Sequence, residues 1–326
     1  MDTVLFGDCR EGLRTFEMLG VTAQTCVTSP PYYGLRDYGH PGQLGLEETP
    51  EQYVTAMVEV FRAVRRVLAD DGTLWLNVGD SYAGSWGAQG RQGNAGQMAG
   101  RAVADARQRS KIQAARIEAG AYPSKISRTG AIPVGSGLKP KDLIGIPWML
   151  AFALRADGWY LRQEIIWHKP NPMPESVRDR CTKAHESIFL FAKSERYFVD
   201  EAGLKEPAVD KRGPGNTKPV RTDGTEYMRT RGALHSIGVR EMRNRRSVWT
   251  VPTRPYKGAH FATFPPDIVE PCIAAGNRPG DIVLDPFMGS GTTAAQAKRM
   301  GRHYIGCELN PAYEALQIER IAKAST

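Results

Sequence analysis

The chain has 326 residues, a net charge of +8 and a pI of about 9.2, with 41% hydrophobic and 24% charged residues. This balance excludes a disordered chain, and no run of about 18 apolar residues predicts a membrane-spanning helix. Five cysteines without a C-x-x-C pair argue against a disulfide framework or a zinc ribbon. Because the N-terminus also lacks a secretory pattern, we expect a cytoplasmic protein. The basic charge favours a polyanionic partner.

The predicted elements alternate along the chain, which is the pattern of an α/β protein. Thr49-Pro50-Glu51-Gln52 is typical of a helix start with Thr49 as the cap, and Asp71-Gly72 is predicted to end that helix. A strand, this helix and a second strand indicate a parallel βαβ unit. Strands are predicted at 2–6, 24–28, 73–78, 160–167, 186–192, 281–285 and 303–307, and further helices at 142–157, 267–275, 292–300 and 311–323.

Two basic stretches interrupt this alternation. Residues 84–137 hold ten glycines and eight Lys or Arg against two acids, and they are predicted to be mostly loop with a helix near 101–119. Residues 205–246 hold eleven Lys or Arg against five acids, an excess of +6 that is most of the net charge of the chain. The stretch 84–137 is expected to be either a tolerated surface insertion or a basic flap that orders on DNA. The stretch 205–246 cannot build a large core, so its charges are expected to face a partner, with a solvated basic surface as the alternative.

A glycine-rich turn follows the strand that ends at Asp285. Gly289 and Gly291 allow a close approach that a Cβ would block, and the helix behind them offers free N–H groups. Asp285 stands at the carboxyl end of its strand, where open α/β sheets bind ligands, so it is expected to be a ligand group rather than part of the core. Glu308 follows 23 residues later, the spacing at which a carboxylate reaches ribose hydroxyls.

Three ligands compete for this turn. A nucleoside-triphosphate loop would need Gly-Lys-Ser/Thr, but Gly291 is followed by Thr292. A dinucleotide turn would need G-x-G-x-x-G, which is absent here. S-adenosylmethionine fits best, because an acid beside the turn is favourable for its positive charges. A plain tight turn without a ligand remains the alternative.

A second rigid turn, Ser29-Pro30-Pro31-Tyr32, directly follows the strand 24–28. Two successive prolines stiffen the backbone and remove two N–H donors. The Pro30 carbonyl and the Ser29 hydroxyl are then acceptors beside the flat ring of Tyr32. Two acceptors and a stacking face suit a planar aromatic molecule that bears an amino group. An ordinary Pro-Pro loop is the alternative.

These two motifs together resemble those of amino-group DNA methyltransferases, the family that methylates N4 of cytosine or N6 of adenine. The catalytic motif of that family, [D/N/S]-P-P-[Y/F/W], matches Ser29–Tyr32, and its cofactor motif, D-P-F-x-G-x-G-T, matches Asp285–Thr292. The catalytic motif comes first and a basic region separates the two, which resembles the β-type order. The resemblance implies a circularly permuted, Rossmann-like, mostly parallel sheet with helices on both faces.

The resemblance also implies site residues and a division of the chain. It makes 1–83, 138–200 and 248–326 the catalytic domain, 84–137 a flexible basic insertion and 201–247 the candidate target-recognition region. Phe6-Gly-Asp8 and Phe261–Pro265 resemble further cofactor segments of the family. The implied catalytic residues are Ser29, Pro30, Pro31 and Tyr32; the implied cofactor residues are Asp8, Phe264, Asp285, Pro286, Phe287, Gly289, Gly291, Thr292 and Glu308; and the candidate DNA contacts are Arg240, Arg243, Arg245 and Arg246.

The implied reaction moves a methyl group from S-adenosylmethionine to an exocyclic amine of a base that has left the duplex stack. In this family Ser at the first motif position is commonest among N4-cytosine enzymes, so cytosine in double-stranded DNA is favoured over N6 of adenine. A protein glutamine or an RNA amine remains a further alternative. The resemblance is also compatible with two protein partners, a second copy of the chain in a homodimer and a cognate restriction endonuclease.

Other chemistry is less well supported by the sequence. A C5-cytosine enzyme would need a nucleophilic Cys after Pro, but Pro271-Cys272 falls inside a predicted helix, where Cys272 is expected to be a packing residue. The histidines show no metal-ligand spacing, and His168 and the His185-Glu186 pair are expected to form hydrogen bonds or to face DNA. Trp148, Trp159 and Trp167 are expected to lie mostly in the core.

Overall fold

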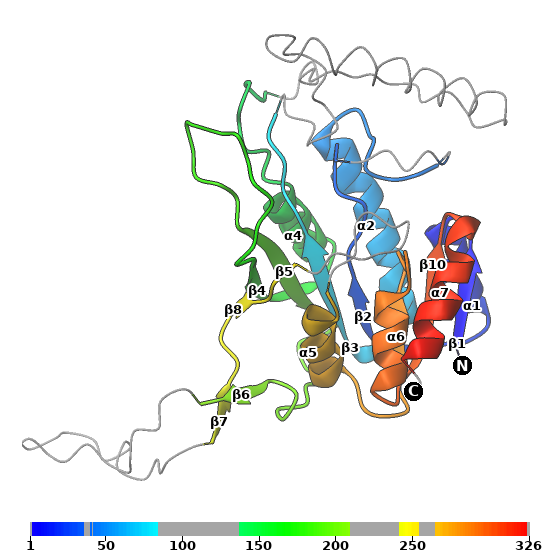
Figure 1. The fold of residues 1–326 in the computed structure, drawn as a ribbon. Helices are drawn as coiled ribbons and strands as arrows, with labels where there is room; N and C mark the ends of the chain where they lie inside the picture. The colour runs from blue at the N-terminus through cyan, green and yellow to red at the C-terminus, as the bar shows by residue number, and fades with distance from the viewer. Residues whose placement is uncertain are drawn as a thin grey trace, which may run out of the picture.

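The computed structural model describes residues 2–35, 40, 42–83, 137–208, 241–253 and 265–324. Its main sheet consists of β1 (Asp2–Phe6), β2 (Ala23–Thr28), β3 (Leu68–Val78), β4 (Tyr160–His168), β5 (His185–Ala192), β8 (Val248–Thr250), β9 (Ile282–Asp285) and β10 (His303–Glu308). The strand order is β1-β10-β9-β2-β3-β5-β4-β8 (Figure 1). Neighbouring strands pair in parallel except that β5 runs against β3 and β4. The predicted mostly parallel sheet is confirmed.

The two ends of the chain build one half of this sheet. N-terminal β1 pairs with β10 from Asp2↔Tyr304 to Phe6↔Glu308, and β9 pairs with both β10 and β2. Figure 1 accordingly shows the first and last elements side by side. This closure is the arrangement expected of a circularly permuted fold.

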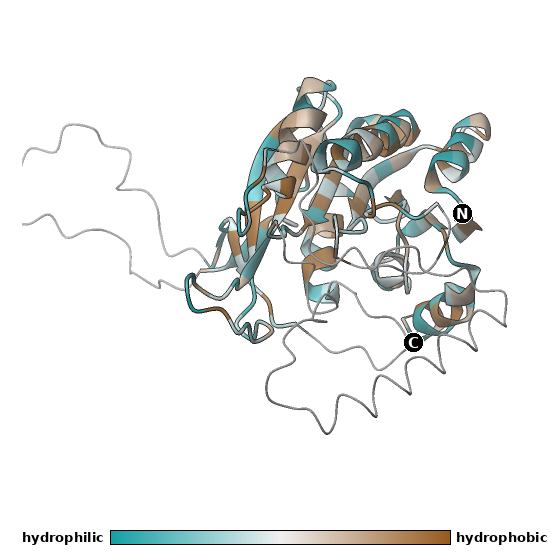
Figure 2. Cartoon of the chain, turned by 90° about the horizontal axis from the view of Figure 1, so that it is seen from above, coloured by the Kyte–Doolittle hydropathy of each residue, from teal (hydrophilic) through white to brown (hydrophobic). Residues whose placement is uncertain are grey.

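Helices cover both faces of the sheet, as the sequence predicted. One face is covered by α1 (Cys9–Met18), α2 (Pro50–Val67) and α4 (Ile146–Ala156), and the other by α5 (Pro266–Gly276), α6 (Thr292–Arg299) and α7 (Glu314–Lys323), which follows the short 3-10 helix Pro311–Tyr313. The helices carry separate hydrophobic and hydrophilic stripes (Figure 2). Such stripes are what a helix needs to bury one side against a sheet.

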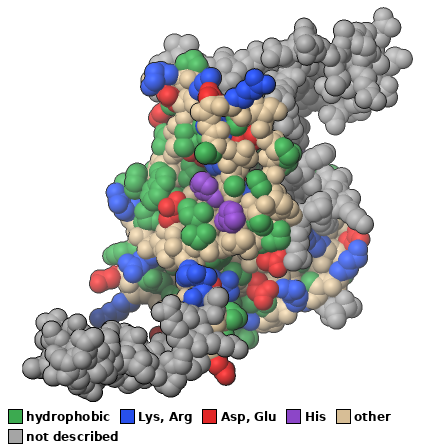
Figure 3. All heavy atoms as spheres, turned by 60° about the vertical axis from the view of Figure 1, so that its left-hand side comes forward, with side chains coloured by type: hydrophobic (Ala, Val, Ile, Leu, Met, Phe, Trp, Pro, Cys, Tyr) green, Lys and Arg blue, Asp and Glu red, His purple; other side chains and the backbone are tan. Residues whose placement is uncertain are grey.

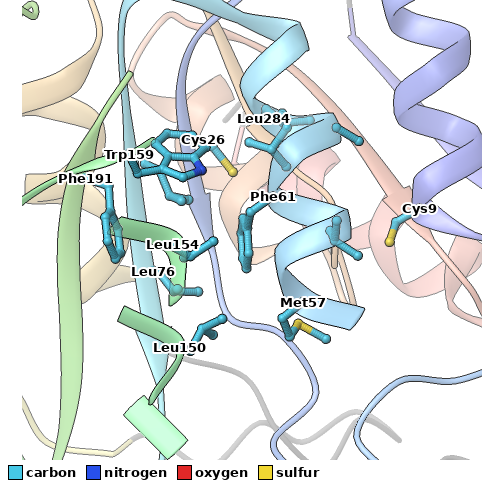
Figure 4. Close-up of a cluster of buried hydrophobic side chains, with 14 of the residues drawn as sticks. Cys9, Cys26, Met57, Phe61, Leu76, Leu150, Leu154, Trp159, Phe191 and Leu284 are labelled. Atoms are coloured by element: carbon cyan, nitrogen blue, oxygen red, sulfur yellow. The ribbon is translucent and has the colours of Figure 1, made fainter. Parts of the chain in front are cut away.

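The larger core lies between the sheet and the α1, α2 and α4 layer. Figure 4 shows Phe61 of α2 among Leu76 of β3, Leu154 of α4 and Phe191 of β5, and all four side chains are completely buried. Burial of one such side chain contributes roughly 1.5–3 kcal/mol. A second core on the other face includes Cys272 at 1% exposure, which confirms it as a packing residue within α5.

Several local expectations are corrected. Helix α2 keeps its predicted start, because Thr49 Oγ1 accepts a hydrogen bond from Gln52 N at 3.2 Å, but it ends at Val67 rather than at Asp71-Gly72. Leu68 is already extended, and the β2–β3 register shifts so that 69–72 lie opposite Gln24 alone. The Asp-Gly pair therefore belongs to an irregularity within β3 and not to the helix end.

Helix α4 begins at Ile146, four residues later than predicted, because Gly145 has a left-handed backbone with φ of 85°. The Asp80 carboxylate, from the loop after β3, accepts hydrogen bonds from Gly145 N and Ile146 N and caps the helix. Helix α1 was not predicted at all. Trp159 and Trp167 are buried as expected, but Trp148 on α4 is 42% exposed.

The stretch 205–246 is not wholly irregular. Within it, β6 (Lys205–Pro207) and β7 (Met242–Asn244) pair antiparallel in a separate two-stranded sheet. The predicted domain division stays a prediction, and 84–136, which make up nearly all of the predicted insertion, lie outside the described residues. No helix in the described part of the chain is both long enough and apolar enough to cross a membrane.

Candidate active site

Five parallel strands, β1, β10, β9, β2 and β3, end at one edge of the sheet. Polar side chains gather at or just beyond these ends, and they are Asp8, Glu308, Asp285, Ser29 and Asn77. The carboxyl edge of a parallel sheet is where α/β proteins bind their ligands. The structure therefore brings the two sequence motifs to the same edge of the sheet.

Side chains of β10 and α7 hold the glycine turn in place through hydrogen bonds. Gly289 N donates to Glu308 Oε2 at 2.7 Å, and Gln317 Nε2 donates to Gly289 O at 2.7 Å. Gly289 and Gly291 have φ of 54° and 81°, conformations that favour glycine. Burial raises the pKa of Glu308 above its ordinary value. Thr292 begins α6 directly behind the turn.

Asp285 is more deeply buried than the sequence suggested. Its side chain is 2% exposed and accepts hydrogen bonds from Thr28 Oγ1 and Thr293 Oγ1, both at 2.7 Å, and from Phe287 N at 3.0 Å. Burial raises the pKa of Asp285 to about 6. The expectation that this carboxylate lies outside the core is wrong, because it links the ends of β2 and β9 to the start of α6.

The remaining residues predicted to bind the cofactor have different surroundings in the structure. Asp8 caps α1, accepting from Arg10 N at 2.8 Å, and the guanidinium of Arg10 lowers the pKa of Asp8. Pro286 is buried, and Phe287 packs against the larger core. Phe264 lies outside the described residues.

The Ser29–Tyr32 turn is fixed by groups from several elements. Tyr53 of α2 donates its hydroxyl to Pro31 O at 2.9 Å. A Cβ on Gly79 would lie 2.5 Å from Cε2 of Tyr32, so only glycine leaves room for this ring. The Pro30 carbonyl accepts no hydrogen bond from the residues that the structure describes. An acceptor therefore stays available at the turn, as the sequence predicted.

A partly buried polar network lies beside this turn, and sequence reasoning missed most of it. Tyr32 Oη donates to Glu186 Oε2 at 2.7 Å and lies 3.1 Å from Asn77 Oδ1. Ser29 Oγ lies 3.3 Å from Asn77 Oδ1, and Lys169 pairs with Glu186 Oε1. Burial and the charge of Glu186 raise the pKa of Tyr32 well above its ordinary value, so the phenol keeps its proton.

A weak sequence signal for this network existed. Asn77 is a polar residue in the otherwise apolar run 74–78, and Glu186 stands at the start of an apolar strand. The expectation that Glu186 forms hydrogen bonds is confirmed. No pattern in the sequence indicated that its partner is Tyr32, 154 residues earlier.

The predicted DNA-contacting arginines lie apart from both turns. Arg243 and Arg246 both donate to Glu206 Oε1, and the Arg245 guanidinium lies 5.4 Å from the centre of the Trp249 ring. The segment that leads into β6 hydrogen-bonds to Asp71 O near the start of β3, the end of that strand opposite the catalytic turn. Arg240 lies outside the described residues.

Basic and acidic side chains are interspersed on one face of the described part of the chain (Figure 3). On the face shown in Figure 3, the described Lys and Arg side chains lie beside Asp and Glu side chains. A DNA-contacting role for the four arginines stays a prediction. Among the described residues, no three His, Cys, Asp or Glu side chains are grouped closely enough to hold a metal ion.

Comparison with known proteins agrees with this geometry. A family model described as DNA methylase matches residues 23–320. The Type II methyltransferase M.XycI of Xanthomonas campestris pv. cyanopsidis is 45% identical over 323 residues, which cover 98% of this chain and 87% of that protein. M.SmaI of Serratia marcescens is 42% identical over 320 residues, covering 98% of this chain and 90% of its own length.

Solved structures share the fold at lower identity. The PvuII DNA methyltransferase (cytosine-N4-specific) has a TM-score of 0.57 at 17% identity, covering 98% of this chain and 86% of that one. A protein of Thermus thermophilus, solved in complex with S-adenosyl-L-methionine, has a TM-score of 0.56 at 23% identity, covering 100% of this chain and 95% of that one. Because the family model and the relatives span nearly the whole chain, the protein belongs to the N6/N4 DNA methylase family and is a DNA methyltransferase.

Proposed function

We propose that the protein transfers a methyl group from S-adenosylmethionine to the N4 amine of cytosine in double-stranded DNA. The observation that carries this proposal is the hydrogen bond from Thr28 Oγ1 to Asp285 Oδ1, 2.7 Å long. Thr28 is the residue before Ser29, and Asp285 opens the glycine turn. A base at the first turn and a methyl donor at the second would thus be neighbours, as a single direct displacement requires.

The cofactor is S-adenosylmethionine, and the residues at the edge suit it. Two φ-positive glycines leave the turn before α6 without side chains at these positions, and the acidic residues Asp8, Asp285 and Glu308 at this edge would favour its positive charges. Glu308 would hold the ribose hydroxyls, and the backbone from Phe287 to Gly291 would pack against the rest of the molecule. When bound, the cofactor supplies an electrophilic methyl group on a sulfonium.

The chain supplies the groups that make the amine reactive. The lone pair of an exocyclic amine is delocalised into its ring, which makes the nitrogen a poor nucleophile. Hydrogen bonds from its two N–H groups to Ser29 Oγ and Pro30 O would localise that lone pair on the nitrogen. Tyr32 would pack against the flipped base. Cys272 is buried within α5, which agrees with a mechanism that needs no covalent enzyme intermediate.

Cytosine is favoured over adenine because Ser29 stands at the first motif position, where N4-cytosine enzymes of the family most often have Ser. N6 of adenine is the main alternative, and methylation of a protein or RNA amine is a more distant one. We further propose a Type II role beside a cognate restriction endonuclease in the cytoplasm, since the relatives are named Type II methyltransferases. A homodimer also remains a proposal.

The base assignment is tested by analysing the product. Duplex DNA is incubated with the protein and isotopically labelled S-adenosylmethionine, then digested to nucleosides and analysed by mass spectrometry. N4-methylcytosine is the expected product. Label in N6-methyladenine would overturn the choice of base, and label only in protein or RNA would overturn DNA as the substrate in this proposal. Resistance of the methylated DNA to a neighbouring endonuclease would test the restriction partner.

A further inference from the structure

A carboxylate outside both motifs, that of Glu186 at the start of β5, lies at the centre of the network beside the catalytic turn. Its side chain is 16% exposed and pairs with the ammonium of Lys169 through Oε1. Its other oxygen, Oε2, accepts from Tyr32 Oη at 2.7 Å and from Asn77 Nδ2 at 3.3 Å. Neither the catalytic motif nor the cofactor motif includes Glu186, Asn77 or Lys169.

The chemistry of these groups favours one direction for the hydrogen bonds among them. A carboxylate only accepts, and Glu186 Oε2 at 2.7 Å is a closer and charged acceptor than Asn77 Oδ1 at 3.1 Å, so the single proton of Tyr32 Oη points to Glu186. The Asn77 amide donates to Glu186 Oε2 and to Ser187 O, both at 3.3 Å. That orientation turns Asn77 Oδ1, which only accepts, toward Ser29.

This ordering decides where the hydroxyl proton of Ser29 points. Its Oγ lies 3.3 Å from Asn77 Oδ1 and 3.4 Å from Tyr32 Oη, and both of those oxygens are free to accept. A hydroxyl has one proton and two lone pairs. With the proton directed into the network, only lone pairs remain for an incoming N–H group.

We propose that Glu186 is a positioning residue, which makes Ser29 a hydrogen-bond acceptor for the target amine by ordering Tyr32 and Asn77. This inference rests on the proposed function, in which Ser29 Oγ accepts an N–H of the base. Glu186 itself does not touch the substrate. Its effect is on the methyl-transfer rate rather than on the binding of cofactor or DNA.

The test replaces Glu186 with glutamine, which keeps the size and removes the charge. The ammonium of Lys169 will attract the amide oxygen, so the amide NH₂ will face Tyr32 Oη and donate to it. Tyr32 then releases its proton toward Ser29 and Asn77, and the order of the network is reversed. We expect the single-turnover rate of methyl transfer to duplex DNA to fall about tenfold to a hundredfold. KM for DNA and cofactor affinity by calorimetry should stay unchanged.

Two further variants serve as controls for this result. Glu186→Asp keeps the charge and should recover part of the lost rate. Glu164→Gln is the matched control, because Glu164 on neighbouring β4 also accepts from a hydroxyl, Ser187 Oγ at 2.8 Å, but lies outside the network. It should keep the wild-type rate. If Glu164→Gln lost as much rate as Glu186→Gln, a general effect of the sheet edge would replace the proposed role.

A double-mutant cycle separates this inference from the proposed function. If Glu186 acts through Ser29, Glu186→Gln adds no further loss once Ser29→Ala is present. A wild-type rate for Glu186→Gln, or fully additive losses, would reject the positioning role while leaving the proposed function intact. A wild-type rate for Ser29→Ala would reject both the positioning role of Glu186 and the acceptor role of Ser29. Should Glu186→Gln fail to fold, Tyr32→Phe breaks the same link with the ring kept, and the same losses and non-additivity are expected.

Discussion

The glycine turn and the proline turn lie on one edge of the sheet, yet they are held in different ways. The glycine turn is held by side chains that follow it in sequence, those of Glu308 and Gln317, which lie 19 and 28 positions from Gly289. The proline turn is held by the side chains of Tyr53, Asn77 and Glu186, and the last two lie 45 and 154 positions from Tyr32. Both turns therefore depend on tertiary contacts, and the turn on the catalytic side is held by side chains from farther away than those that hold the turn on the cofactor side.

Asp285→Ala should have the largest effect, because Asp285 joins the two sides. Its loss leaves the hydroxyls of Thr28 and Thr293 and the Phe287 N–H without their acceptor. We expect cofactor binding to be abolished and the free energy of unfolding to fall by about 2 kcal/mol or more. Calorimetric titration and urea unfolding measure the two effects. Undiminished cofactor affinity in a folded variant would remove Asp285 from the cofactor site.

Asp285→Asn is the matched control, and it also predicts a pH dependence. The pKa of Asp285 is about 6 in the native state against an ordinary 3.8, so the native state holds this proton more tightly than the unfolded chain does. The charged carboxylate therefore costs stability, and that cost grows as the pH rises from about 4 to about 6. The stability of Asp285→Asn relative to the wild type should rise over the same range. A difference that does not change with pH would contradict this assignment.

Tyr32→Ala and Pro30→Ala should affect the catalytic side alone. Both changes act on the pocket for the flipped base or on the acceptor for its amine, and no hydrogen bond within the described residues joins either of them to the glycine turn. We expect the single-turnover rate to fall roughly a hundredfold or more, with cofactor affinity preserved. Gly79→Ala should produce a smaller loss of rate by displacing the Tyr32 ring. A wild-type rate in either main variant would show that the base pocket lies elsewhere.

The predicted arginine cluster should give the smallest effect, one confined to DNA binding. Replacing Arg240, Arg243, Arg245 and Arg246 with Ala should weaken DNA binding and leave cofactor binding unchanged. Each lost phosphate contact flattens the log–log salt dependence by roughly 0.9. The side chain of Arg246 is 67% exposed and that of Arg243 29%, so the single change at Arg246 should flatten it more.

Filter-binding titrations across a salt series measure this slope. Arg243→Ala serves as the internal comparison, because that side chain is directed to Glu206 and its loss should reduce stability more than DNA affinity. If the variant with all four arginines replaced bound DNA with the wild-type affinity and salt slope, another segment of the chain would have to recognise DNA. The glycine-rich stretch 84–137 would then be the next candidate.

The sequence alone determined the features that depend on residues close together in the chain. Glycines that need positive φ, two prolines that stiffen a turn, and Thr49 as a helix cap act through neighbouring atoms. Strand and helix alternation likewise follows from local spacing of apolar residues, so the parallel α/β fold could be predicted. The resemblance of both motifs to one family then indicated the chemistry.

Only the tertiary structure decided which polar groups meet. The Thr28–Asp285 hydrogen bond joins residues 257 positions apart, and Tyr32 meets Glu186 across 154 positions. Strand β5 runs against its neighbours and so brings its first residues to the carboxyl edge, an arrangement that no local pattern encodes. The same holds for Asp285, because burial depends on what packs around a strand end rather than on the strand itself. Side-chain partners chosen by long-range packing are therefore visible only once the chain has folded.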